Sequence, residues 1–435
     1  MSAAQDSIDL VRVGPGTVMG EFMRNYWIPC AKSSELVAGG APMRLPLMGE
    51  KLIAYRAPSG DVGIMDQRCP HRCASLFLAR NEAAGLRCVY HGWQFDTSGK
   101  CLDIPSVSNG AALKNTVRAK AYKVQERNGL VWVYMGRLDP APPMPAIEVN
   151  TLLDEELLIE FVYRECNWLQ SLEGDIDTSH FGFLHVGALE PHQLDEAHPF
   201  YGTVANRVPD YRAADTPWGT SYGAYRQLPQ GHYYWRAANF LFPFWTQIPA
   251  KDMEKSIHAR AWVPIDDHRT MFIGIYAAKH FSSDRPRFQL TDGTVLETGY
   301  RTVNNFLPNT TAWYGRWRVR ENEANDWQID RVAQRTNYSF TGIENIHLQD
   351  QAVTESMGPN TDHGWEHLTK SDTMIGITRR RLLRAAHKFA EDSVPPPGSV
   401  DGETFVGARG GCFTTKNATD WHPGRRYSPM DQAES

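Results

Sequence analysis

Two short motifs constrain the fold of this 435-residue chain more than any other feature: Cys69-Pro70-His71 and Cys88-Val89-Tyr90-His91. Each motif contributes one thiolate and one imidazole, and sixteen residues separate them. Such a set can bind zinc in a tetrahedral structural site, or hold a [2Fe-2S] cluster with the thiolates on one iron and the imidazoles on the other. Zinc fingers usually group Cys with Cys and His with His, so the mixed order favours the cluster.

The sequence around these motifs predicts a small antiparallel β domain. Between about Pro46 and Gly136, short β-type runs alternate with turn pairs such as Ser59-Gly60 and Ser98-Gly99. A proline-rich segment that starts at Leu138 cannot continue a helix or a central strand, and is predicted to be the linker. We therefore expect a first domain over residues 1–150, including an N-terminal extension, and a second over residues 151–435.

The second part of the chain mixes strand-like and helical patterns, which predicts an α+β unit. Apolar and aromatic runs around residues 233–249 and 270–278 indicate strands, and a helix is expected to start near Trp168. The segment 371–392 keeps apolar residues at helical spacing, and its arginines are predicted to form a solvated face: Arg379, Arg380, Arg381 and Arg384.

Composition excludes several classes of protein. Forty-five Lys and Arg against fifty Asp and Glu leave no positive excess for a nucleic-acid backbone. No run reaches the roughly 18 apolar residues of a membrane span, and the N-terminus does not read as a secretory signal. Seven cysteines are too sparse for a disulfide scaffold, which favours a cytoplasmic location. Cys73 is expected to be a small buried thiol and Cys101 to have no chemical role.

A second group of candidate metal ligands lies in residues 173–185. His180 and His185 are five residues apart, about 140° on a regular α-helix, so a shared metal requires a wider turn, and Gly182 makes that distortion cheap. Two imidazoles and one carboxylate on one face suit non-haem Fe(II) with open positions. Spacing alone does not select the carboxylate, and the candidates are Glu344, Asp350, Glu355 and Asp362.

With these motifs, the chain resembles the Rieske non-haem iron oxygenases, in particular oxygenase components of the phthalate dioxygenase type. The resemblance rests on CPHRCASL, CVYHGWQFDTSGKC, NWLQSLEGDIDTSHFGFLH and LQDQAVTES, and it covers most of the chain. It implies an N-terminal antiparallel β Rieske domain, and a C-terminal catalytic domain of the helix-grip type with an antiparallel sheet and helices.

The resemblance also assigns roles to individual residues. It implies a Rieske [2Fe-2S] cluster on Cys69, His71, Cys88 and His91, and a mononuclear non-haem Fe(II) on His180, His185 and Asp350. Asp177 would link His180 to His91 of a neighbouring subunit, which requires a ring of subunits, usually a trimer, or stacked trimers. Asn167, just ahead of the iron helix, also matches the family and is expected to shape the iron's surroundings.

The implied function is oxidation of a small aromatic substrate with O₂ and electrons from a reductase of the flavin or ferredoxin type. Dihydroxylation of an aromatic acid such as a phthalate-like compound is the main reading. Oxidative O-demethylation or N-dealkylation of an aromatic ether or anilide is the alternative, because the iron ligands are the same. A Rieske electron carrier without oxygenase activity is a third reading, but it would need only the first 150 or so residues.

Residues that contact the substrate are predicted from chemistry alone. An aromatic acid requires a cation, since a bidentate arginine suits a carboxylate, and the candidates are Arg207, Arg226 and Arg236. Phe240 and Phe242 are expected to line an apolar pocket, although aromatic residues in a strand are more often core.

Overall fold

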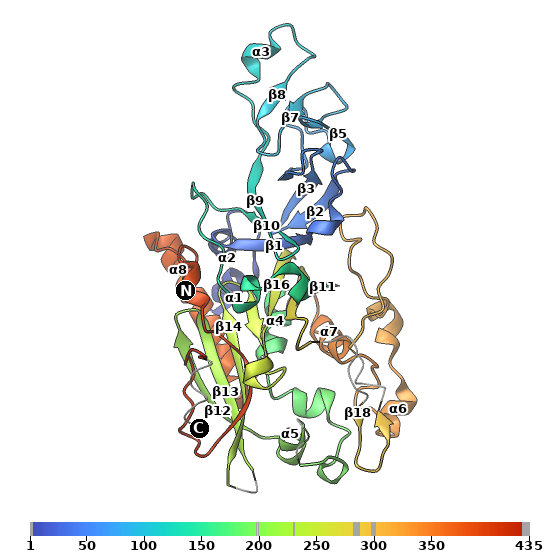
Figure 1. The fold of residues 1–435 in the computed structure, drawn as a ribbon, viewed down its shortest axis with the longest axis vertical. Coiled ribbons are helices and arrows are strands. Elements are labelled where there is room, and N and C mark those ends of the chain that lie inside the picture. Colours follow the sequence, from blue (N-terminus) through green and yellow to red (C-terminus); the bar gives the residue numbers. More distant parts are fainter. Residues whose placement is uncertain are drawn as a thin grey trace.

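The structure is a computed structural model that describes residues 3–196, 198, 200–228, 231–281, 288–296 and 302–428. The molecule is elongated, with a narrow end built from β5, β7, β8 and α3 and a broad end that contains the large sheet and most helices (Figure 1). Within the described ranges, no helix is both long and apolar enough to cross a lipid bilayer.

The narrow end contains two antiparallel sheets. The larger one has the strand order β1-β10-β9-β4-β3-β2, with bounds β1 Trp27–Lys32, β2 Met43–Leu47, β3 Glu50–Arg56, β4 Val62–Asp66, β9 Ala121–Arg127 and β10 Leu130–Tyr134. The smaller one runs in sequence order: β5 Arg80–Glu82, β6 Gly85–Arg87, β7 Gln94–Phe95 and β8 Cys101–Asp103, followed by the short helix α3 Gly110–Leu113. The predicted antiparallel β domain is confirmed, and residues 138–147 form neither helix nor strand.

The broad end is built on one antiparallel sheet with the order β11-β17-β16-β15-β14-β13-β12. Its strands are β11 Leu157–Arg164, β12 Asp210–Thr216, β13 Gly219–Gln227, β14 Tyr233–Leu241, β15 Trp245–Gln247, β16 His258–Asp266 and β17 Arg269–Ala277. The C-terminal strand β20 Gly411–Thr415 pairs with the first half of β14, while β15 pairs with its end. A separate hairpin consists of β18 Phe288–Gln289 and β19 Val295–Leu296.

Helices α4 and α8 pack on this sheet, and an amphipathic helix does so through an apolar stripe at helical spacing. In α8, the buried residues recur every fourth position: Met374, Thr378, Leu382 and Ala386. The helices other than α3 have these bounds: α1 Ala3–Val11, α2 Val18–Met23, α4 Trp168–Ile176, α5 Tyr201–Ala205, α6 Arg331–Arg335, α7 Ile346–Ser356 and α8 Thr373–Asp392. The predicted α+β class, with a long helix against an antiparallel sheet, is confirmed.

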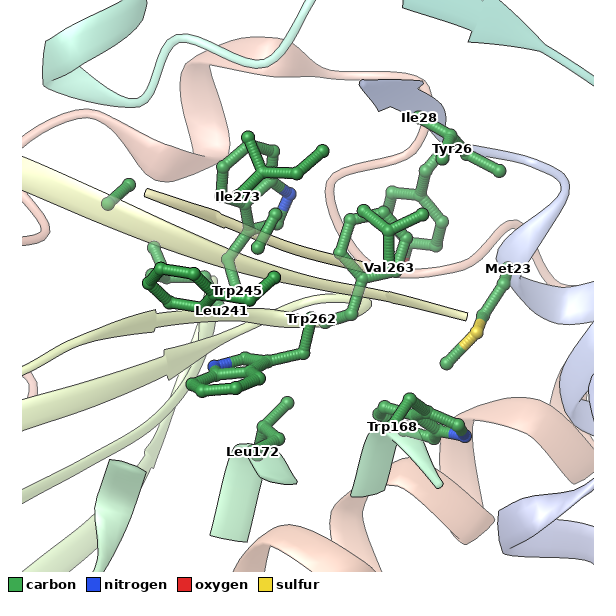
Figure 2. Packing of buried hydrophobic residues seen from close by; sticks show 14 of the residues in the cluster. Met23, Tyr26, Ile28, Trp168, Leu172, Leu241, Trp245, Trp262, Val263 and Ile273 are labelled. Atoms are coloured by element: carbon green, nitrogen blue, oxygen red, sulfur yellow. The ribbon is translucent and has the colours of Figure 1, made fainter. Parts of the chain in front are cut away.

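One continuous core joins the two ends of the molecule. Figure 2 shows Met23 and Ile28, from the N-terminal part, beside Val263 of the large sheet, with Trp168 and Leu172 of α4 in the same cluster. Helices α1 and α2 also pack on α8, so the N-terminal extension belongs to the large unit by contact. A second, smaller cluster around Tyr55 and Phe95 fills the narrow end.

The arginine-rich face of α8 differs from its prediction. Arg379 is largely buried and forms ion pairs with Glu173 and Glu366, both at 2.5 Å. Arg381 pairs with Asp215 at 2.8 Å and is also mostly covered. Only part of the arginine run is therefore a solvated face, because helical spacing cannot show which basic residues meet acids on other elements.

Candidate active site

The two Cys/His motifs form the facing tips of the narrow end. A turn closes the first motif through the hydrogen bond from Cys73 N to Cys69 O, and the second closes through Gly92 N and Cys88 O. The left-handed backbone of Gly92 allows that second turn, since any β-carbon there would meet Pro105 at 2.8 Å. The two imidazole rings, of His71 and His91, come to 4.4 Å between centroids.

The chemistry of these side chains fits an iron–sulfur cluster. The Nδ1 atoms of His71 and His91 are both buried and have no hydrogen-bond partner, although a buried polar atom is normally satisfied. Burial, and then the Cys88 thiol beside it, raise the pKa of Cys69 to about 11, while the backbone N–H of His71 works in the opposite direction. Two buried imidazole nitrogens without partners beside two buried thiols are the ligand set that a [2Fe-2S] cluster requires.

The neighbouring cysteines have other environments. Cys73 is exposed and has a left-handed backbone, so the expectation that it is buried is wrong. The turn that closes the first motif directs its side chain outward. Cys101 is buried, and its sulfur lies 3.7 Å from the carbonyl oxygen of Asp103.

The second group of ligands is built on a single π-helical turn, Phe181–His185, directly after α4. The wider turn brings residues five apart toward the same face of the helix, because a π-helix bonds each residue to the fifth along the chain. The distortion predicted between His180 and His185 is present, and their Nε2 atoms lie 3.2 Å apart.

Asp350 completes this group from α7. Its Oδ1 atom lies 3.1 Å from His185 Nε2 and 3.5 Å from His180 Nε2. One ligand atom from each of the three residues falls within 4.8 Å of the others, which suits a single metal ion. Of the other candidate carboxylates, Glu355 accepts hydrogen bonds from the backbone of Glu165, and Asp362 accepts one within an exposed loop.

Side chains behind the ligands orient both imidazoles. His185 Nδ1 lies 2.8 Å from Gln349 Oε1, and His180 Nδ1 lies 3.6 Å from Asp177 Oδ2. Such partners fix the tautomer that leaves Nε2 free for a metal. Gln349 was not predicted, and its only sequence signal is that it precedes Asp350.

Burial and charge act against each other on these groups. Burial alone would raise the pKa of Asp350, but His185 and His180 lower it well below its usual range. Burial would lower the pKa of His180, yet the hydrogen bond that it donates to Asp177 and the charge of Asp350 raise it overall. The carboxylate is therefore ionised at neutral pH, as a metal ligand must be.

Comparison with known proteins identifies the family. Residues 26–123 match the Rieske [2Fe-2S] domain, and residues 133–406 match the family described as LigXa C-terminal domain like. The chain is 48% identical over 423 residues to the 3-chlorobenzoate-3,4-dioxygenase oxygenase subunit of Comamonas testosteroni, covering 97% of both chains. The chain belongs to the Rieske oxygenase family.

Other relatives agree with this assignment. The phthalate 4,5-dioxygenase oxygenase subunit of Pseudomonas putida is 31% identical, covering 89% of this chain and 87% of that one. The solved structure of Pseudomonas putida CBB5 NdmA with caffeine shares the fold, with a TM-score of 0.56 at 18% identity, over 93% of this chain and 100% of that one.

These matches confirm the predicted enzyme class and the two iron cofactors of the family. An isolated Rieske electron carrier would not match over residues 133–406, so that reading is wrong. As the oxygenase component of a Rieske system, the protein depends on a separate electron donor.

The His180, His185 and Asp350 group of this Rieske oxygenase opens onto a cavity of about 540 Å³. Phe181, Phe200 and Phe281 are among its apolar walls, and β1 contributes Lys32 from the narrow end. The volume is in the range of small-molecule sites. A substrate with one aromatic ring therefore has room beside the ligand group.

Arg236 is the predicted cation that the structure places on this cavity. It is only 7% exposed, its Nε donates to Thr178 Oγ1 at 3.2 Å, and its guanidinium lies 4.4 Å from the ring centroid of Phe181. Among the described residues, no carboxylate forms an ion pair with it. Neighbouring Arg226 is off the cavity wall, and burial, followed by the charge of Arg236, lowers its pKa to about 10.

Four other predicted site residues lie away from the cavity: Arg207, Phe240, Phe242 and Asn167. Arg207 donates to the carbonyl oxygens of Gly182, Val186 and Leu189, so it holds the end of the π-helical turn. Phe240 and Phe242 are fully buried: their ring centroids lie 5.3 Å apart, and the ring centroid of Phe22 on α2 lies 5.9 Å from that of Phe242.

Asn167 does not face the iron group either. Its Oδ1 accepts from Leu169 N at 2.9 Å as the cap of α4, and its Nδ2 donates to Val11 O and Asp267 O. It therefore positions the helix that leads to His180, and does not contact the cavity.

Proposed function

We propose that this protein is the oxygenase component of a dioxygenase that dihydroxylates the ring of a benzoate-type aromatic acid. The observation that carries the proposal is the cavity next to His180, His185 and Asp350. Arg236 is buried on its wall, and no carboxylate among the described residues forms an ion pair with it. The relative at 48% identity, whose name gives 3-chlorobenzoate as its substrate, supports the same class.

The two metal sites supply the redox chemistry, and the protein positions the reactants. We propose Cys69, His71, Cys88 and His91 as holders of the cluster, and His180, His185 and Asp350 as holders of the iron. When bound, the cluster transfers single electrons and the ferrous iron activates O₂. Arg236 would hold the substrate carboxylate by charge-assisted hydrogen bonds, and the apolar walls would exclude water from the ring.

Asp177 is the proposed link between the two sites. Asp177 lies beside Nδ1 of His180, on the side of the ring opposite the proposed ligand atom Nε2. Its side chain is about a quarter exposed. Burial alone would raise its pKa, but the hydrogen bond and charge of His180 lower it, so it is ionised. In the proposed assembly, a ring of three subunits brings His91 of one chain to Asp177 of the next.

The proposed domain division and location follow the same evidence. Residues 1–150 would carry the cluster and residues 151–435 the iron; one family match ends at residue 123 and the other begins at residue 133, which supports two units. All seven cysteines are free in the structure, which supports a reducing cytoplasmic setting.

Oxidative O-demethylation is the second candidate. It is favoured by one relative, the 5,5'-dehydrodivanillate O-demethylase oxygenase subunit of Sphingobium, which is 32% identical over 91% of this chain. An aromatic acid with a methoxy group would use the same cavity and the same arginine.

A substrate panel with a surrogate reductase tests the proposal. Benzoate, 3-chlorobenzoate, phthalate and 3-methoxybenzoate are compared by diol formation and by formaldehyde release. Diol from the benzoates is expected. Formaldehyde release from the methoxy acid, without diol from the others, would favour the demethylase instead.

Arg236→Met sharpens the test of carboxylate binding. Loss of one charge-assisted contact should raise KM for benzoate by roughly 10-fold or more, while leaving KM for uncharged benzamide within about 2-fold. Arg380→Met, on the exposed face of α8, is the matched control. Equal changes for acid and amide would contradict a carboxylate contact.

A further inference from the structure

Glu160 is an acidic side chain on the cavity wall that the proposed chemistry has not used. It lies on β11 and lines the same cavity as His180 and Asp350. In the described part of the chain, its one hydrogen bond comes from Asn304 Nδ2 to Oε1 at 2.6 Å, and no basic side chain forms an ion pair with it. A charged carboxylate with so few partners is costly to bury, whereas a protonated one is not.

A chain of two amides fixes the orientation of Glu160. Asn345 Nδ2 donates to Asn304 Oδ1 at 3.2 Å, so the amino group of Asn304 must point to Glu160. Asn345 is also the cap of α7, the helix that carries Asp350. The position of Glu160 is therefore tied to the helix that holds the third ligand.

A side cavity connects Glu160 with that ligand. It measures about 20 Å³, and its wall includes Glu160, Ser171, Asn304, His347 and Asp350. A cavity of this size holds about one water, and the polar wall offers that water several hydrogen-bond partners. The geometry provides a path for a proton between Glu160 and the ligand group.

The charges around Glu160 do not cancel the effect of burial on its pKa. Burial raises its pKa, and Arg260, Asn304, Arg164 and Lys32 oppose this without reversing it. Arg260 is already paired with Asp175 at 2.6 Å, which offsets its effect. The titratable or charged groups that face Glu160 come from five elements: Lys32 on β1, Arg164 on β11, Arg260 on β16, Tyr276 on β17, and His347 and Asp350 on α7 across the side cavity.

We propose that Glu160 carries a proton at neutral pH and releases it, through a water in the side cavity, into the cavity beside His180, His185 and Asp350. The inference rests on the proposed function, because adding O₂ and two electrons to an aromatic ring to form a dihydrodiol consumes two protons. Each transfer breaks the O–H bond of Glu160 and leaves a carboxylate, which solvent at the cavity opening protonates again. Two transfers balance the two electrons from the reductase.

Infrared spectroscopy tests whether Glu160 holds the proton. The holoenzyme, without substrate or reductase, should show a protonated-carboxyl band at pH 7 that is missing in Glu160→Gln. Glu155→Gln removes an exposed carboxylate five residues earlier, in the 3-10 turn before β11, and should leave the band unchanged. An identical band in Glu160→Gln and the wild type would overturn the proposal.

Coupling of O₂ consumption to product tests whether the proton is used. Glu160→Gln should form roughly 100-fold less diol per unit time and release hydrogen peroxide, because proton transfer by a positioned group contributes about this much. Glu160→Asp, which keeps the acid, should recover part of the rate and shift its pH profile. Wild-type coupling in Glu160→Gln would overturn the proposal.

The two tests separate this inference from the proposed function. A wild-type protein that forms no diol from any aromatic acid contradicts the proposed function. The infrared comparison needs no substrate, so it still decides whether Glu160 holds a proton.

Discussion

At the scale of single residues, His180 is held between two carboxylates with different tasks. Asp350 approaches Nε2 at 3.5 Å, while Asp177 lies 3.6 Å from Nδ1. The first carboxylate shares the metal position, whereas the second faces outward from it. Replacing Asp177 should therefore affect electron transfer more than metal binding.

Asp177→Asn is the corresponding prediction. The amide can still accept the hydrogen bond from Ser179 N, so the turn should form and iron analysis should give three irons per chain, as in the wild type. Turnover should fall by roughly 10- to 100-fold, the usual cost of losing a partner behind a metal ligand. A variant with full iron and wild-type turnover would remove Asp177 from the electron route.

His258 makes the stability of the protein depend on pH. Burial, and then the charge of Arg260, lower its pKa to about 3 from the ordinary value of 6.5. Its ring accepts a hydrogen bond from Ile248 N, next to the cavity wall. Between these pH values the unfolded chain binds one more proton than the folded chain.

The free energy of unfolding should consequently fall as the pH drops below 6.5, by up to about 1.4 kcal/mol per pH unit, and the contribution is complete above 6.5. His258→Gln keeps an acceptor but does not titrate, so its urea-unfolding free energy should change less between pH 6.5 and 5. The exposed His192→Gln is the control. Parallel slopes for wild type and His258→Gln would contradict the assignment.

At the scale of elements, the π-helical turn depends on Arg207. This turn carries both imidazole ligands. The carbonyl oxygens at its end have no N–H partner of a continuing helix, so they need other donors. Arg207, in the loop between α5 and β12, donates these hydrogen bonds. It is a support of the metal site, and does not line the cavity.

Arg207→Met should lower iron occupancy of the mononuclear site by roughly 10-fold, with little effect on the cluster. Iron analysis would then approach two per chain, while the visible spectrum of the cluster stays intact. KM for benzoate should be unchanged in the fraction that retains iron. A raised KM with full iron would instead restore the substrate role predicted from the sequence.

Arg379 joins α8 to α4 through a buried carboxylate. It contacts Glu173 at 2.5 Å, and burial raises the pKa of Glu173 although Arg379 lowers it. Arg379→Met leaves Glu173 without its partner, so the free energy of unfolding should fall by about 3 kcal/mol or more. Chemical denaturation measures this, with Arg380→Met as the exposed control. Adding Glu173→Gln should recover part of the loss.

At the scale of the whole molecule, the two metal-binding regions are far apart within one chain. β7, which follows the second Cys/His motif, lies near one end of the long axis, and α4 and α5, which flank the π-helical turn, lie in the other half (Figure 1). A ring of chains placed head to tail would bring the two regions together across an interface.

Mixed assemblies test this arrangement. Cys88→Ser chains lack the cluster and should be inactive alone, whereas Asp177→Asn chains lack the link and should keep at most about a tenth of the wild-type activity. Co-expression in equal amounts should restore about one quarter of the wild-type activity, because one in four neighbours pairs an intact cluster with an intact Asp177 in a random ring. No recovery would place the electron route within a single chain.

The site residues that could be predicted from their spacing lie within a few residues of one another in the sequence. The order of Cys and His in the two motifs, and the five-residue spacing of His180 and His185, each carry their geometry within a few residues. Asp350 lies 165 residues beyond His185 along the chain, so only the family resemblance selected it.

The wrong predictions concern residues whose surroundings are determined by packing between segments far apart in the sequence. Phe240 lies on the same strand as Arg236, but its ring packs against Phe242, which packs against Phe22 of α2, and the cavity does not reach it. Arg207 was predicted from its charge, whereas its three carbonyl partners become available only after the π-helical turn forms. Glu160 had no signal in the sequence, and Gln349 had only its position before Asp350, because their neighbours come from distant segments.

The packing of α1 and α2 against α8 has a consequence for synthesis of the protein on the ribosome. Residues up to about 134 can complete the sheets of the narrow end as soon as they emerge. The iron-binding half instead needs α8 and β20, the last described elements, to close its core and pair with β14. Assembly of that half therefore waits until β20 has been made, and a truncation after residue 370 should cost the mononuclear iron while sparing the cluster.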